Sequence, residues 1–248
     1  MKKISIKVVL LLSLSTYLFS STINIAVASN VSYAIKSLII QFNKQYPNIK
    51  VYPTIGSSGK LTAQIKYGAS YDIFISANMF YPNILYKQQI AITPPKIYAK
   101  GSLALLSSSQ KDFTKGLDIV LSNNIKKIAM ANPKTAPYGK ATFELLKNTK
   151  LYSKISSKLV YAESISQTLR YTISACDVGF VAKSLLFSKS MKKYKKGINY
   201  IDIPSTLYTP ISQGIVLLKN SSQDGRLFYD FMLSGKAKAI LKDYGYEI

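Results

Sequence analysis

Short apolar runs alternate along the chain with stretches in which apolar residues recur at helical spacing. Residues 23–28 form the first apolar run, and residues 31–46 carry apolar side chains three and four positions apart. Pro47 and Asn48 interrupt this helical pattern before a second apolar run at residues 50–55. Buried strands and amphipathic helices produce these two periodicities. The pattern therefore predicts strand–helix alternation, which is typical of a mostly parallel sheet covered by helices.

This alternation occurs twice, and two longer predicted strands, at residues 101–107 and 209–218, separate the two sets. The first set continues with a helix at 61–67 and a strand at 71–76. The second set and the end of the chain are predicted to contain strands at 127–131, 159–162 and 178–181 and helices at 138–146, 164–174, 223–233 and 236–244. We therefore expect an α/β protein with two lobes.

The order of these elements also predicts how the lobes are connected. Lobe 1 is expected to be discontinuous, with residues 22–101 and 209–248, and lobe 2 to contain residues 102–208. Each lobe would be a mostly parallel sheet flanked by helices. The two crossover strands would form a hinge over a cleft.

The first 21 residues have the layout of a secretory signal. Lys2 and Lys3 give a basic start, residues 8–19 are apolar, and the small residues Ser20 and Ser21 follow. The apolar run is shorter than the roughly 20 residues that a membrane-spanning helix needs. Residues 1–21 are therefore predicted to be a signal peptide for export to the periplasm, and an uncleaved N-terminal anchor stays open as the alternative.

The amino-acid composition limits which partners and which kinds of catalytic or metal site are possible. The chain of 248 residues has 33 Lys and Arg against 11 Asp and Glu, and the net charge of +22 indicates an anionic partner. The densest basic cluster, residues 192–196, has no nucleic-acid-binding motif beside it and is interpreted as a solvated loop. The absence of His excludes Ser-His-Asp triads and histidine metal sites. The single Cys176 excludes an internal disulfide.

Four predicted strand-to-helix turns share one design, at residues 28–30, 56–59, 136–139 and 163–165. In open α/β sheets, ligands bind at such turns, beyond the carboxyl ends of the strands. Each turn presents free backbone N–H groups and the positive end of a helix dipole, which together favour an anion. Side-chain donors could be added by Ser29, Asn30, Ser57 and Ser58. The alternative that these residues only cap helices stays open.

Two tempting motifs are incomplete. Ser57-Ser58-Gly59-Lys60 fits the S-x-x-K pattern of penicillin-interacting serine enzymes, but the S-D-N and K-T-G elements are missing. A P-loop would need Gly at position 54, where Thr54 stands. Asp72 is interpreted as a structural carboxylate that bonds the turn at residues 56–59. We therefore predict no catalytic residue, no cofactor and no metal coordinated by side chains.

Residues 25–30, 56–65 and 71–77 closely resemble the periplasmic molybdate-binding proteins of ABC importers. Residues 132–139, 178–181 and 241–246 extend the resemblance over nearly the whole exported chain. The Gly-Ser-Ser-Gly-Lys-Leu segment and the Asp-Ile-Phe-Ile-Ser-Ala strand are its most specific parts. The resemblance implies a type II periplasmic-binding fold with an oxyanion held between the lobes.

The resemblance also implies a set of ligand-binding residues: Ser29, Asn30, Ser58, Tyr138 and Ile165, the last through its backbone N–H. Many relatives have a further tyrosine after the Gly-x-Val strand that contacts the anion. In this chain Ala182 stands at that position, and the Ser29-Asn30 pair with Tyr138 is typical of the branch that replaces the contact. The number of donors therefore stays open.

The resulting hypothesis is a non-catalytic, exported and monomeric solute-binding protein. It would capture molybdate or tungstate in the cleft between the lobes and deliver the anion to the membrane permease of an ABC transporter, without a cofactor and without a nucleic-acid partner. Two alternatives are kept. The same fold could bind another small anion such as sulfate, or the chain could be an exported enzyme that uses a serine and a lysine.

Overall fold

The computed structural model describes residues 21–248. The predicted signal peptide at residues 1–21 lies outside this part of the chain, apart from Ser21, which is the first residue of strand β1. Within residues 21–248, no helix is long and apolar enough to cross a membrane.

The first five-stranded sheet belongs to lobe 1 and has the strand order β2-β1-β3-β10-β4. β1 pairs in parallel with β2 on one side and β3 on the other, and β10 is antiparallel to both β3 and β4. The strands are β1 (Ser21–Ala28), β2 (Ile49–Gly56), β3 (Ile73–Ile75), β4 (Lys96–Gly101) and β10 (Ile211–Leu217).

The second sheet belongs to lobe 2 and repeats this plan with the order β7-β6-β8-β5-β9. β6 pairs in parallel with β7 and β8, whereas β5 is antiparallel to β8 and β9. The strands are β5 (Leu103–Leu106), β6 (Ile128–Ala131), β7 (Leu159–Ala162), β8 (Val178–Ala182) and β9 (Tyr200–Asp202). The prediction of two α/β lobes is confirmed, and in each sheet four of the five strands run in the same direction, with β10 or β5 as the exception.

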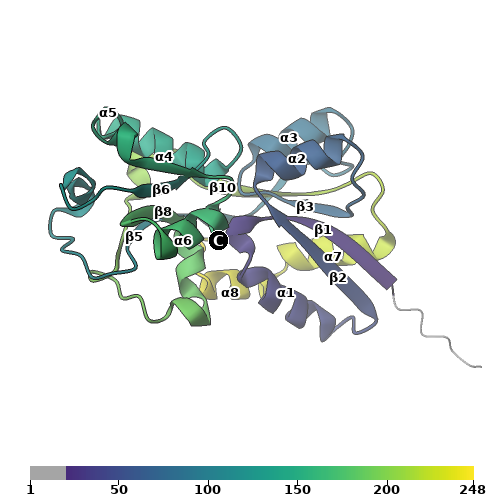
Figure 1. The fold of residues 1–248 in the computed structure, drawn as a ribbon. Helices are drawn as coiled ribbons and strands as arrows, with labels where there is room; N and C mark the ends of the chain where they lie inside the picture. The colour runs from purple at the N-terminus through teal and green to yellow at the C-terminus, as the bar shows by residue number, and fades with distance from the viewer. Residues whose placement is uncertain (1–20) are drawn as a thin grey trace, which may run out of the picture.

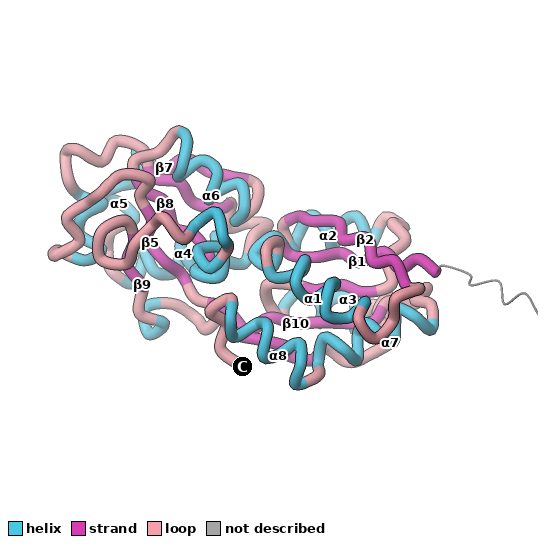
Figure 2. The backbone as a smooth tube through the Cα atoms, turned by 90° about the horizontal axis from the view of Figure 1, so that it is seen from below, coloured by secondary structure: helices cyan, strands magenta, loops and turns pink. Residues whose placement is uncertain are grey.

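The chain crosses between the lobes in two places. The predicted strand at 101–107 is in fact the end of β4 and the whole of β5, which lie in different sheets and are separated at Ser102. The return crossing runs from β9 to β10, and β10 lies wholly in the first sheet. The predicted domain limits, after residue 101 and before residue 209, fall in these connections, and as domain limits they stay a prediction. Seen from below, the two lobes lie side by side (Figure 2).

Helices cover both faces of the first sheet (Figure 1). Ile23, Ile25 and Val27 of β1 pack in the core formed with α1, α7 and α8, whereas Ala26 packs with α2 and α3. This alternation follows from the two-residue period of a strand whose faces are both buried. The helices are α1 (Ala34–Asn43), α2 (Ser58–Lys66), α3 (Phe80–Lys87), α7 (Gln223–Leu233) and α8 (Gly235–Asp243).

Lobe 2 has a single large core around its sheet. Its α-helices are α4 (Pro137–Asn148), α5 (Tyr152–Ile155) and α6 (Ile165–Ser174). Short 3-10 helices in the two lobes are η1 (Ser29–Val31), η2 (Gly116–Leu121), η3 (Ser156–Lys158), η4 (Lys183–Phe187), η5 (Lys189–Met191) and η6 (Ser205–Leu207). The C-terminal segment runs past α8 (Figure 2), where Glu247 pairs with Lys100 of β4, and the Tyr246 side chain reaches Asn30 in η1.

Candidate anion-binding site

The carboxyl ends of β1, β2, β6 and β7 lead into turns that meet between the lobes. These turns line a small, partly open cavity with about 180 Å³ of atom-free space, including the space at its opening. Its lining comes from both lobes and consists of Ala28, Ser29, Asn30, Gly56, Ser57, Ser58, Ala77, Ala136, Pro137, Tyr138 and Ile165. The structure thus brings all five predicted site residues to one cavity. None of these lining side chains carries a formal charge, so the cavity offers dipoles rather than ions.

At the helix beginnings around this cavity, some backbone N–H groups remain free. The N-cap residues of η1, α2 and α4 are Ala28, Ser57 and Ala136, and none of them makes a side-chain cap hydrogen bond. Among the hydrogen bonds of residues 21–248, none uses the N–H of Ser58 or of Ile165, at the first positions of α2 and α6. Free N–H groups at a helix N-terminus, together with its dipole, form a site suited to an anion.

Three hydroxyl groups at the cavity already accept a hydrogen bond from the protein. Ser29 Oγ accepts from Ser166 N at 3.4 Å, and Ser58 Oγ accepts from Ala77 N at 3.0 Å. Tyr138 Oη accepts from a side-chain amide, Gln213 Nε2, at 3.0 Å. A hydroxyl that accepts an N–H retains its own hydrogen for another partner. These three side chains are therefore arranged as donors.

The Asn30 side chain has a different role from these hydroxyl groups. Its Nδ2 donates to Gln213 Oε1 at 2.7 Å and to Tyr246 Oη at 2.8 Å, so both amide hydrogens are used within the protein. Tyr246 Oη in turn donates to the Asn30 carbonyl oxygen at 3.0 Å. A donor from Asn30 to the cavity is therefore its backbone N–H rather than its side chain.

Burial holds the phenols around the cavity in their protonated form. Desolvation, with Tyr246 as a neighbour, raises the pKa of Tyr138 well above its ordinary value. Burial likewise raises the pKa of Tyr246. Both groups therefore remain hydrogen-bond donors throughout the neutral pH range.

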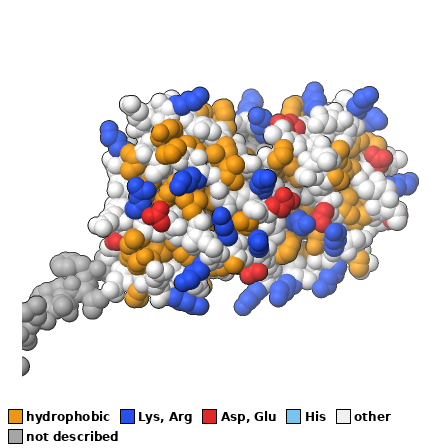
Figure 3. Space-filling view, turned by 180° about the vertical axis from the view of Figure 1, so that it is seen from behind, with side chains coloured by type: hydrophobic (Ala, Val, Ile, Leu, Met, Phe, Trp, Pro, Cys, Tyr) orange, Lys and Arg blue, Asp and Glu red, His pale blue; other side chains and the backbone are white. Residues whose placement is uncertain are grey.

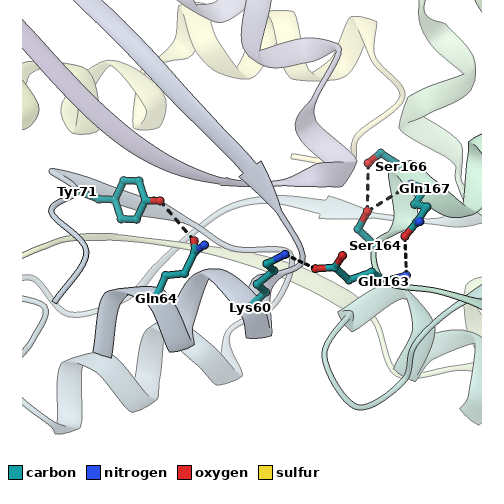
Figure 4. Close-up of polar contacts among 7 residues, drawn as sticks. All are labelled: Lys60, Gln64, Tyr71, Glu163, Ser164, Ser166 and Gln167. Carbon is teal, nitrogen blue, oxygen red and sulfur yellow. Dashed lines mark hydrogen bonds and ion pairs between the residues drawn. The ribbon is translucent and has the colours of Figure 1, made fainter. Parts of the chain in front are cut away.

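Contacts between the lobes lie beside the cavity. Gly59 N donates to Thr135 O at 2.9 Å, which joins the start of α2 to the turn before α4. Lys60 Nζ on α2 pairs with Glu163 Oε1 on lobe 2 at 2.7 Å, and both side chains are about half exposed (Figure 4). The structure therefore has the lobes in contact around the site.

One expectation is wrong, and the structure adds detail at two further positions. Asp72 does not bond the turn at residues 56–59: its carboxylate accepts from Asn24 N at 2.9 Å and from Ser222 N and Oγ at 2.8 and 2.9 Å, at the opposite end of the sheet. Ala182 lies in the core of lobe 2 and does not line the cavity. Ser57 was predicted as a possible side-chain donor but is not in the set that the resemblance implies; it lines the cavity, and its buried Oγ has no partner within residues 21–248.

The sequence reasoning also missed Gln213, whose amide joins two of the predicted site residues. A polar residue in the middle of an apolar strand pattern is the signal that could have found it. The described residues contain no cluster of three or more His, Cys, Asp or Glu side chains that could hold a metal ion.

The basic surface is spread out rather than gathered at one place. Figure 3 shows Lys and Arg side chains scattered over the visible face with few Asp and Glu between them. Such a field can raise the encounter rate with anions without fixing where they bind, and it is screened by salt. Specificity therefore has to come from the uncharged cavity.

Comparison with known proteins agrees with this geometry. Residues 23–247 match the family model described as "Bacterial extracellular solute-binding protein". The chain is 32% identical to the molybdate-binding protein ModA of Rhodobacter capsulatus, over 89% of this chain and 86% of the relative. Among solved structures, it is similar to the periplasmic molybdate-binding protein of Azotobacter vinelandii (TM-score 0.84, 32% identity, 91% of this chain and 99% of the other). It is also similar to the substrate-binding domain of a putative molybdenum ABC transporter from Clostridium difficile (TM-score 0.66, 28% identity, 92% and 99%). The chain therefore belongs to the family of bacterial extracellular solute-binding proteins.

Proposed function

We propose that this chain captures molybdate or tungstate in the cavity between its lobes, for import by an ABC transporter. The relatives named above bear the name of molybdate-binding or molybdenum-transporter proteins, and they cover nearly all of this chain. The proposed ligand-binding residues are Ser29, Asn30, Ser58, Tyr138 and Ile165.

One observation carries this proposal: the hydroxyls of Ser29, Ser58 and Tyr138 each accept an N–H and keep a hydrogen for a guest. With the free N–H groups of Ser58 and Ile165, the cavity offers a convergent set of uncharged donors. A fully deprotonated oxyanion is an acceptor on all sides, so it can use every one of them. The small volume favours a compact tetrahedral ion over a large organic ligand.

Transport follows from the two-lobed arrangement. The donors come from both lobes, so a bound anion stabilises the form in which the lobes are in contact, because it binds that form more tightly. A permease can then recognise the closed form. We propose a monomer that acts in the periplasm after export, with no catalytic step and no resident cofactor.

Two other functions have less support. Sulfate is also a small tetrahedral dianion, but the similar sulfate-binding protein from Mycobacterium tuberculosis is only 13% identical and indicates the fold alone. A serine–lysine enzyme would need Lys60 beside a serine hydroxyl. Instead Lys60 Nζ pairs with Glu163, and Lys60 does not line the cavity.

Calorimetric titration of the purified exported chain tests the proposal directly. Molybdate and tungstate should release heat and raise the melting temperature, because a ligand that binds only the folded state stabilises it by mass action. Sulfate and phosphate serve as competitors of similar shape. An absence of both heat and thermal shift with molybdate and tungstate would overturn the proposal, and tighter binding of sulfate would replace it with the sulfate alternative.

A further inference from the structure

Gln213 is a fully buried polar residue in β10, and the other buried residues of this strand are aliphatic or glycine. Its side-chain amide makes three hydrogen bonds. Oε1 accepts from Asn30 Nδ2 at 2.7 Å and from Tyr98 Oη at 2.8 Å, and Nε2 donates to Tyr138 Oη at 3.0 Å. Gln213 does not line the cavity, but two of its partners, Asn30 and Tyr138, do.

These bonds connect the two lobes behind the cavity. Asn30 follows β1 in lobe 1, whereas Tyr138 lies in the first turn of α4 in lobe 2. Gly101, at the crossing between the lobes, leaves room for the connection, because a Cβ at this position would collide with Tyr138 Oη and Gln213 Nε2. One amide group therefore sets the positions of two cavity residues that belong to different lobes.

The direction of these hydrogen bonds also determines which hydrogens remain available to the cavity. An amide nitrogen only donates, so the Tyr138 oxygen must accept from Gln213, and its single hydrogen stays available to the cavity. The amide oxygen only accepts, so it takes up one Asn30 Nδ2 hydrogen, and Tyr246 Oη takes up the other. A group that accepted from Tyr138 instead would remove the phenol hydrogen from the cavity.

We propose that Gln213 is a positioning residue that makes Tyr138 a hydrogen-bond donor to the bound anion by donating to its oxygen. This proposal deepens the proposed function and rests on it. Gln213 contributes to anion affinity without touching the anion, through the direction of one hydrogen bond.

The variant Gln213→Glu tests the direction of that bond, because it keeps the shape of the side chain and makes its chemistry depend on pH. When protonated, the introduced carboxyl has one O–H that can donate to Tyr138 and one oxygen that can accept from Asn30. When ionised it can only accept, so it takes the Tyr138 hydrogen and also repels a dianion. Burial raises the pKa of a carboxyl toward neutrality, so the change falls in an accessible range.

Tungstate binding to the intact chain and to Gln213→Glu is measured by calorimetry from about pH 5 to about pH 8. The intact chain should bind equally across this range, since no lining side chain other than the protonated Tyr138 titrates. It also serves as the control for any change in the anion itself. Gln213→Glu should bind at least about 100-fold more weakly at the upper end and recover at least about tenfold at the lower end. Loss of charge repulsion alone would give the same recovery without the Tyr138 hydroxyl, so the recovery should be clearly smaller when Gln213→Glu is combined with Tyr138→Phe.

A double-mutant cycle gives a second readout. Gln213→Met fills the same space without hydrogen bonding and should weaken binding roughly tenfold, as should Tyr138→Phe. Because Gln213 acts through Tyr138, Gln213→Met should cost less than about threefold in the Tyr138→Phe background. Thr93→Val is the matched control, because it removes the buried Thr93 Oγ1 that accepts from Leu217 N of β10, the strand that contains Gln213. It should lower the melting temperature without changing tungstate affinity.

The outcomes separate this inference from the proposed function. If the intact chain binds tungstate and Gln213→Glu shows the same flat pH profile, the positioning role is overturned and the proposed function stands. Full additivity of Gln213→Met and Tyr138→Phe overturns it as well. If the intact chain binds neither tungstate nor molybdate, the proposed function fails and this inference fails with it.

Discussion

Serine residues stand at the beginning of α2, α7 and α8, but they do different things there. Ser222 and Ser234 cap α7 and α8: their Oγ atoms accept from Gly225 N at 3.0 Å and Ala237 N at 3.4 Å. Ser57 holds the same N-cap position before α2, with an extended backbone, yet makes no cap hydrogen bond. The three positions share a residue type and a local backbone conformation.

The difference depends on what each helix beginning faces. Ser222 is exposed and Ser234 is half-buried, whereas Ser57 and Ser58 are buried between the lobes. The beginnings of α7 and α8 do not line the cavity, and each serine there satisfies one N–H group of its own helix. The beginning of α2 keeps the Ser58 N–H and hydroxyl hydrogen available to the cavity. Anion affinity and helix stability should therefore respond to different serines.

The largest expected effect on tungstate affinity comes from Gly59 at the beginning of α2, and Gly235 at the beginning of α8 is its control. A Cβ on Gly59 would lie 2.8 Å from Thr135 O of the opposite lobe, whereas a Cβ on Gly235 in α8 would meet nothing within 4 Å. Gly59→Ala should keep the lobes apart and weaken tungstate binding by at least about 100-fold, because affinity falls with the fraction of closed protein. Gly235→Ala should leave binding unchanged and stabilise the fold by about 0.5–1 kcal/mol.

Titration calorimetry and thermal unfolding of these two alanine variants give the comparison. Small-angle scattering with saturating tungstate reports whether Gly59→Ala still closes. Binding by Gly59→Ala within about threefold of the intact chain would mean that contact of α2 with lobe 2 is not part of the bound form.

The next largest effect on tungstate affinity is expected at Ser58 of α2, with Ser234 before α8 as the comparison. Ser58→Ala removes a proposed donor and leaves the Ala77 N–H unpaired, so tungstate binding should weaken by about 10- to 100-fold, as expected for one hydrogen bond to a charged group. Ser234→Ala should cost about 1 kcal/mol of unfolding free energy, the usual contribution of a cap, with no change in affinity. Equal affinities of the two variants would show that Ser58 is a structural serine like Ser234.

The sequence predicted the buried framework well because both faces of each sheet are covered. β7 and α7 have the predicted bounds, 159–162 and 223–233, since continuous apolar runs and helical spacing are strong local signals. α3 was missed, because Pro82 near its start looks like a break although the first turn of a helix tolerates proline. β9 was missed because its three residues, Tyr-Ile-Asp, do not form a continuous apolar run, whereas the three residues of β3 do.

The site was predictable only where its residues are local to a strand-to-helix turn. Ser29, Ser58 and Ile165 lie one to three residues after a strand end, which is where ligands bind in open α/β sheets. Gln213 bonds Asn30 across 183 positions of sequence, and no local pattern reports that contact. Whether a serine caps its helix or serves a cavity also depends on what packs opposite, which is a tertiary property.

The smallest expected effect on tungstate affinity comes from the ion pair between the lobes, Lys60–Glu163. Lys60 and Glu163 are about half exposed, so their interaction is weakened by solvent and should contribute only about 0.2–1 kcal/mol to the closed form. Lys60→Met and Glu163→Gln should each change tungstate affinity by less than about fivefold, and their double-mutant cycle should give a coupling in that range. The coupling should fade in high salt, because salt screens exposed charges. A coupling that is large and insensitive to salt would mean that this pair, rather than the uncharged donors of α2, holds the lobes together around the anion.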